Sequence, residues 1–128
     1  MKIKLPIKVY NEANNTDHWT KKAARHKKQK IAIYCMLKDV VTPEMLPCKI
    51  ILTRISPRKL DQHDNLPMAF KFILDSVASL LVPGKAIGQA DSDKRISVEY
   101  DQRKGEKYEC AMEIEIIKAN NVLEKENR

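Results

Sequence analysis

Acidic residues in the segment from residue 60 to 75, LDQHDNLPMAFKFILD, could bind a metal ion. At about 100° per residue, Lys71 and Asp75 fall within roughly 20° of Asp64 on one side of a helix, opposite its apolar residues. A carboxylate at this place is also an ordinary helix cap, and Lys71 with Asp75 is an ordinary exposed pair of charges. For this segment alone, both interpretations stay open.

A second acidic group, Asp91 and Asp93, precedes a run from 95 to 101 with strand-like alternation. Residues two apart in an extended segment point to one side. Two carboxylate clusters, each at the start of an element, can bring hard oxygen ligands to one Mg²⁺, which Mn²⁺ could replace. We therefore expect one metal position surrounded by Asp61, Asp64, Asp91 and Asp93. Three neighbours would support these ligands: Asn65, Asp75 and His63.

Basic residues are concentrated in the first half of the chain. Residues 1–60 hold fourteen Lys and Arg against four Asp and Glu, whereas residues 61–128 hold ten against thirteen. Such an excess suggests a polyanion as the partner. One stretch holds six cations in ten positions and no acid, and contact with DNA phosphates is favoured there over a solvated face: Lys21, Lys22, Arg25, Lys27, Lys28 and Lys30.

Two further cations, Arg58 and Lys59, lie just before the first carboxylates. They could lower the pKa of these carboxylates, or they could hold the phosphate that the metal engages. The sequence does not separate these two roles. We count both residues among the expected DNA-binding residues.

Hydrophobic periodicity predicts the elements that position these residues. Residues 2–9 alternate as a half-buried strand, and Pro6 with the lysines on its open side places it at or near a sheet edge. A long helix is expected from Trp19 to Val40, with its second half, IAIYCML, buried almost all round. The run CKIILTRIS, residues 48–56, is typical of a central strand.

An amphipathic helix is expected to start near Asp64, because apolar residues recur at helical spacing up to Leu81. Residues 95–101 and 108–116 then alternate around a turn at 103–105, which predicts a β-hairpin. The order of elements indicates a single α+β domain, with a mixed sheet of about four strands covered on one face by two main helices.

Length and composition restrict the class of protein. A chain of 128 residues fits one domain, and no apolar run is long enough to span a membrane. The alternating N-terminus is not typical of a signal peptide, so a cytoplasmic protein is expected. The three cysteines lack the spacing of zinc or redox sites and are expected to be reduced, partly buried thiols. No organic cofactor is expected.

The segment LDQHDNLPMAFKFILD, followed by ADSDKRISVEYDQ, resembles the RusA family of endonucleases, which resolve Holliday junctions and are frequent in bacterial phages and prophages. The resemblance covers roughly residues 50 to 117. Asp64-Asn65-Leu66 and Asp93 with Ile96 match the family pattern. The family commonly has its first aspartate two residues before the second, whereas Asp61 here lies three residues before Asp64. The family's lysine position holds Met68 here, and Lys71 follows on the same helix face.

The resemblance implies a Mg²⁺-dependent crossover junction endodeoxyribonuclease, with a nuclease domain at 1–117 and a polar tail at 118–128. It implies a homodimer that binds a four-way DNA junction and cuts two symmetric strands in the cytoplasm of a bacterial cell, encoded by phage or prophage. Asp64, Lys71 and Asp93 would be its catalytic residues. Two alternatives are a non-catalytic DNA-binding domain of the same fold and a metal-dependent nuclease acting on RNA or another branched substrate.

Overall fold

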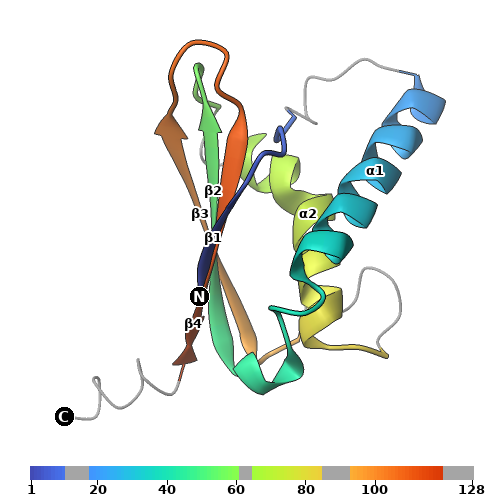
Figure 1. Ribbon diagram of the computed structural model, residues 1–128, viewed down its shortest axis with the longest axis vertical. Coiled ribbons are helices and arrows are strands. Elements are labelled where there is room, and N and C mark those ends of the chain that lie inside the picture. Colours follow the sequence, from blue (N-terminus) through green and yellow to red (C-terminus); the bar gives the residue numbers. More distant parts are fainter. Residues whose placement is uncertain (11–17, 61–64, 85–92, 120–128) are drawn as a thin grey trace.

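The computed structural model describes residues 1–10, 18–60, 65–84 and 93–119 of the chain. A four-stranded sheet forms one layer, and two helices cover one of its faces (Figure 1). The elements in chain order are β1 (Lys2–Leu5), α1 (Trp19–Leu37), the short 3-10 helix η1 (Pro43–Met45), β2 (Cys48–Ser56), α2 (Asn65–Leu81), β3 (Ile96–Lys104) and β4 (Ala111–Lys118). This arrangement confirms the predicted α+β architecture.

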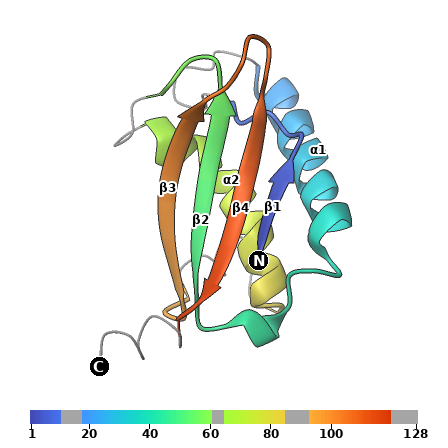
Figure 2. The same ribbon diagram turned by 60° about the vertical axis from the view of Figure 1, so that its left-hand side comes forward.

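Strand β2 lies inside the sheet, whose strand order is β1-β4-β2-β3 (Figure 2). It pairs in parallel with β3, from Cys48 opposite Ile96 to Ser56 opposite Lys104. Its other edge pairs with β4 in the antiparallel direction. The near-continuous apolar run of β2 suits a strand with neighbours on both sides. The prediction of a central strand at residues 48–56 is confirmed.

The predicted β-hairpin between residues 95 and 116 is wrong. Both strands exist, but β2 lies between β3 and β4, so the two do not pair with each other. The connection at residues 105–110 passes the end of β2, where the backbone N–H of Gly105 donates to the carbonyl oxygen of Ser56 at 2.9 Å. Local alternation predicts strands but not their partners, and here each strand gains more from pairing with the apolar β2.

Strand β1 forms an edge of the sheet, as predicted. In the sheet formed by the described residues it pairs with β4, from Lys2 opposite Glu115 to Leu5 opposite Met112. The strand ends before Pro6, which cannot donate a ladder hydrogen bond. The predicted alternation nevertheless places one more side chain in the core beyond the strand, since Val9 is buried like Leu5.

The core lies between the sheet and the buried side of α2. The apolar residues that the periodicity of this helix placed inward are buried, apart from the half-buried Leu80: Leu66, Ala69, Phe70, Ile73, Leu74, Val77 and Leu81. They pack against Ile50 and Leu52 of β2 and Ile114 of β4. The parallel unit β2-α2-β3 is therefore the structural centre of the domain.

The second half of α1 is not buried all round, contrary to the prediction. Ile33 and Leu37 are buried, but Ile31 and Tyr34 are 53% and 55% exposed. This helix is the outermost element on its side of the molecule, so only one stripe of it faces other elements (Figure 1). Cys35 is consequently exposed, whereas Cys48 is buried and Cys110 half-buried. In the part of the chain that the structure describes, neither helix has the length and apolar character needed to cross a membrane.

We predict that Gly105→Ala destabilises the fold. A Cβ at this position would lie 3.0 Å from the Cγ2 of Ile55 and 2.8 Å from a carboxylate oxygen of Glu109. Overpacking of this kind costs about 1–3 kcal/mol, which urea unfolding would measure. Lys107→Ala, in the same connection but exposed, should change the stability by less than about 0.5 kcal/mol. Equal stabilities for the two variants would show that the crossing does not require glycine.

Candidate nucleic-acid interface and the predicted metal ligands

The basic residues of α1 lie on two flanks of the helix. At about 100° per residue, Lys21, Arg25 and Lys28 fall on one flank, while Lys27 and Lys30 fall on the opposite one. Four of the six predicted cations are exposed, namely Lys21, Lys27, Lys28 and Lys30, and the other two, Lys22 and Arg25, are half-buried. The helix therefore presents ammonium groups to solvent on both sides of its outer surface.

The first flank is joined by two residues from the chain just after β1. The guanidinium carbon of Arg25 lies 4.5 Å from the ring centre of Tyr10, and the Nζ of Lys8 lies 4.9 Å from it. Lys28 lines two shallow recesses beside the same ring, of about 300 and 240 Å³, and Lys21 lines the larger of them. Among the described residues that line these two recesses, none is acidic. We call this group the Tyr10 cluster: Lys8, Tyr10, Lys21, Arg25 and Lys28.

The second flank faces α2. Lys27 and Lys30 line a recess of about 220 Å³ together with Phe72, Asp75 and other residues of the two helices. The predicted catalytic Lys71 is exposed nearby, with its Nζ 5.8 Å from the ring centre of Phe72. Asp75, expected to support a metal ligand, is one of the residues that line this recess between the helices.

A buried arginine holds the Tyr10 cluster and the predicted DNA-binding Arg58 against the sheet. The Nε of Arg54 donates to the carbonyl oxygen of Val9 at 3.1 Å, and its Nη1 donates to that of Arg58 at 2.6 Å. Arg54 is 7% exposed, and burial lowers the pKa of its guanidinium. Two segments more than forty residues apart in the chain thus meet at one side chain. The side chains of Arg58 and Lys59 are exposed at this end of β2.

The side chain of Gln102 in β3 holds the same segment further along. Its Nε2 donates to the carbonyl oxygen of Leu60 at 2.8 Å, and its Oε1 accepts from the backbone N–H of Leu60 at 2.9 Å. The amide therefore pairs with the backbone as a strand would. Leu60 is the last described residue before the predicted ligand Asp61, so the approach to the acidic segment is anchored at this end of the sheet.

Among the four predicted metal ligands, Asp93 alone falls within the described residues; Asp61, Asp64 and Asp91 lie outside them, as does His63. One carboxylate oxygen of Asp93 accepts from the backbone N–H and the Nε of Arg95, at 2.9 and 3.0 Å. The other accepts from an Nη of Arg95 at 3.0 Å. These hydrogen bonds raise the pKa of Arg95. Asp93 therefore stabilises the turn that leads into β3.

The described residues next to or within the two acidic regions are Asn65 and Asp93. Asn65 begins α2 near the end of the sheet where Gln102 holds Leu60, whereas Asp93 precedes β3 at the opposite end (Figure 1). The 17 residues of α2 span roughly 25 Å between these ends. Within residues 1–10, 18–60, 65–84 and 93–119, no group of three His, Cys, Asp or Glu is placed to hold a metal ion.

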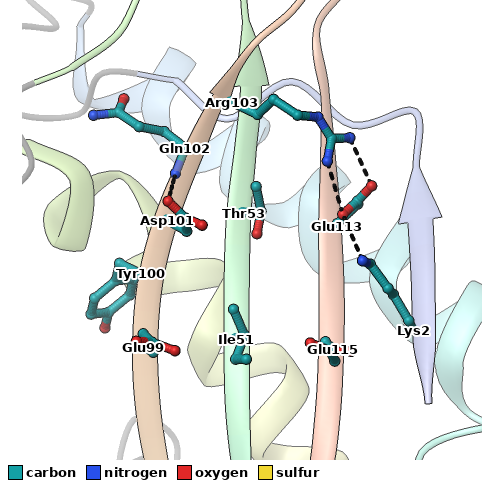
Figure 3. Close-up of a pocket in the computed structure, with 10 residues that line it drawn as sticks. All are labelled: Lys2, Ile51, Thr53, Glu99, Tyr100, Asp101, Gln102, Arg103, Glu113 and Glu115. Atoms are coloured by element: carbon teal, nitrogen blue, oxygen red, sulfur yellow. Dashed lines mark hydrogen bonds and ion pairs between the residues drawn. The ribbon is translucent and has the colours of Figure 1, made fainter.

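Carboxylates gather instead on the open face of the sheet, away from the helices (Figure 3). A cavity of about 550 Å³ there has Ile51 and Thr53 in its lining, with four acidic residues against two basic ones, Lys2 and Arg103. Arg103 bonds Glu113 at 2.7 Å, which lowers the pKa of that carboxyl. The acidic residues are Glu99, Asp101, Glu113 and Glu115. A polyanion would therefore approach the helical side rather than this cavity.

Sequence reasoning missed three residues of the candidate interface. Lys8 and Tyr10 carried no sign that they meet α1, because nothing local relates residues so far apart. Arg54 did carry one, since its charge falls on the same alternating side of the predicted central strand as Ile50 and Leu52.

Comparison with known proteins found no matching protein-family model, no matching curated protein and no matching solved structure.

We predict that Arg54→Met lowers the stability of the fold by about 1–3 kcal/mol, since the carbonyl oxygens of Val9 and Arg58 would lose their donors while buried volume is largely kept. Arg103→Met is the matched control, because it removes a cation whose side chain is 52% exposed in its ion pair with Glu113. Such exposed pairs contribute up to about 1 kcal/mol. Urea unfolding would compare them, and an equal loss would show that Arg54 has no special anchoring role.

Proposed function

We propose that this protein binds branched duplex DNA through the helical side of the molecule. The Tyr10 cluster carries the proposal: four cations from two parts of the chain surround one ring in recesses without an acidic lining residue among those described. Lysine and arginine groups on an exposed helix neutralise backbone phosphates without reading base sequence. The carboxylates on the open face of the sheet would repel DNA phosphates, which favours binding on the helical side.

The proposed activity is Mg²⁺-dependent cutting of four-way DNA junctions by a homodimer in the bacterial cytoplasm. It rests on the resemblance to the RusA family at Asp64, Asn65 and Asp93, with Lys71 as the substitute for the family's lysine. The exposed ammonium group of Lys71 is available to a phosphate, which agrees with its proposed role. Asp93 would have to exchange its hydrogen bonds with Arg95 before it could act on a metal or substrate.

A non-catalytic DNA-binding domain of the same fold is the second candidate. One observation favours it: the described carboxylate among the predicted ligands is held by Arg95 and lies at the opposite end of the sheet from the start of α2. Binding through the Tyr10 cluster needs no metal. The two candidates therefore share the same interface and differ only in whether the bound DNA is cut.

For the interface, we predict that Lys28→Ala and Lys8→Ala each weaken DNA binding and reduce the slope of log K against log salt by about 1, because each removes one phosphate contact. Binding would be measured by fluorescence anisotropy across a salt series. The control is Lys49→Ala, which removes an equal charge from the open face, where Lys49 pairs with Glu99 at 3.2 Å. Equal slopes for all three variants and wild type would contradict the proposed interface.

For the activity, we predict that the protein cuts a synthetic four-way junction in Mg²⁺ and that Asp64→Asn abolishes cutting while binding survives. The substitution is nearly isosteric, and Asn caps a helix about as well as Asp. Asp101→Asn, on the open face, should cut at the wild-type rate. Tight binding without cutting in both Mg²⁺ and Mn²⁺ would establish the non-catalytic candidate. Cutting by Asp64→Asn at the wild-type rate would place the chemistry elsewhere.

A further inference from the structure

Phe72 is an aromatic residue on the polar side of α2. Its ring stacks on the imidazole of His26 from α1, with the centroids 3.7 Å apart and the planes inclined by 22°. Phe72 is nevertheless 37% exposed, whereas the apolar stripe of the same helix is buried without it. The ring is therefore not part of the hydrophobic core, and its outer part is available to another planar group.

The recess around this ring combines three kinds of chemistry. Phe72 and His26 supply aromatic surface, and Lys27 and Lys30 supply positive charge at the wall. The remaining lining residues carry oxygen atoms, and they are Asp75, Ser76 and Ser79. With a volume of about 220 Å³, the recess is small and suits a single planar group more than an extended chain.

The oxygen atoms in the recess are arranged as acceptors. The Oγ of Ser76 donates to the carbonyl oxygen of Phe72 at 3.0 Å, and the Oγ of Ser79 donates to that of Asp75 at 2.7 Å. Because both hydroxyl hydrogens are directed to the helix backbone, the lone pairs of these oxygens can accept further hydrogen bonds. An ionised Asp75 adds acceptors alone. A matching ligand would thus present amino hydrogens at its edge.

We propose that this recess binds one unpaired nucleobase of branched DNA. This inference rests on the proposed function. The base stacks against Phe72, its exocyclic amino group faces the acceptors of Asp75, Ser76 and Ser79, and its neighbouring phosphates lie at Lys27 and Lys30. Aromatic side chains beside cations are the general means by which proteins hold unpaired bases. Adenine, cytosine and guanine carry the required amino group, and thymine does not.

The position of the recess agrees with the Tyr10 cluster. The two lie on opposite flanks of α1, so a duplex whose backbone contacts the cluster has the recess on the other side of a single helix. A helix with its side chains is about 10 Å across. A base leaving the stack at a branch point can therefore reach the recess while the adjoining duplex stays on the cluster.

The test compares Phe72→Leu with Phe72→Tyr. Leucine keeps the apolar contact with α1 but lacks an aromatic face, whereas tyrosine keeps the aromatic face. The probes are a four-way junction carrying 2-aminopurine at one unpaired position at its branch point and an intact linear duplex of equal length. Fluorescence of 2-aminopurine, which falls on stacking, reports the base, and anisotropy reports affinity for each DNA. Thermal unfolding of each variant verifies its fold.

We expect wild type and Phe72→Tyr to quench the 2-aminopurine. Phe72→Leu should lose the quenching and bind the junction about 5- to 150-fold more weakly, which corresponds to the loss of one stacked base. Its affinity for the linear duplex should equal that of wild type. An equal loss for both DNAs would overturn the proposal, because it would show that Phe72 only supports the helix packing.

Other outcomes separate this proposal from the proposed function. Wild type that binds the linear duplex but leaves 2-aminopurine unquenched overturns the base site and keeps DNA binding. Wild type that binds neither DNA overturns both. If Phe72→Leu changes a dimer into a monomer by light scattering while quenching persists, the recess is occupied by a second copy of the chain, and the base site is wrong.

Discussion

The guanidinium of Arg54 is the interaction on which the arrangement of the candidate interface depends. Burying a charged group is costly unless hydrogen bonds replace its water, and here backbone carbonyls of Val9 and Arg58 do so. Hydrogen bonds to charged groups are worth about 1.5–3 kcal/mol each, more than neutral ones. The hydrogen bond from Arg54 therefore also holds Val9 in place, and with it the neighbouring Lys8 and Tyr10. The ring of Tyr10 in turn contacts Arg25 of α1.

The molecule has two different sides, a helical side and an open face of the sheet. Because both helices cover one face of the sheet, the strand residues that point away from them stay in water and are largely charged (Figures 1 and 3). Carboxylates around Thr53 dominate the cavity on that open face, while α1 presents lysines on the other side. A polyanion would meet opposite electrostatic environments on the two sides, and this difference would orient its approach before any specific contact formed.

The acidic residues show how position in the fold changes the meaning of a motif. Asp93 lies in a pattern that suits a metal ligand, yet within the described chain it accepts three hydrogen bonds from Arg95 two residues on. Conversely, Phe72 lies outside the buried apolar stripe of α2. The packing of α1 beside α2 leaves its ring partly exposed among lysines and serines, where an aromatic face can serve recognition.

Local periodicity by itself determined the main elements of this protein: the strand at residues 48–56, the helix ending at Leu81 and the strand containing Lys2. These features follow from side-chain spacing within a few turns or a few strand residues, which the sequence displays directly. Only the tertiary structure decided that β2 separates β3 from β4, that Tyr10 meets Arg25, and that Asn65 and Asp93 lie at opposite ends. Such relations depend on which strands pair and how helices lie across the sheet, and the free energy of those long-range contacts is not encoded in any local pattern.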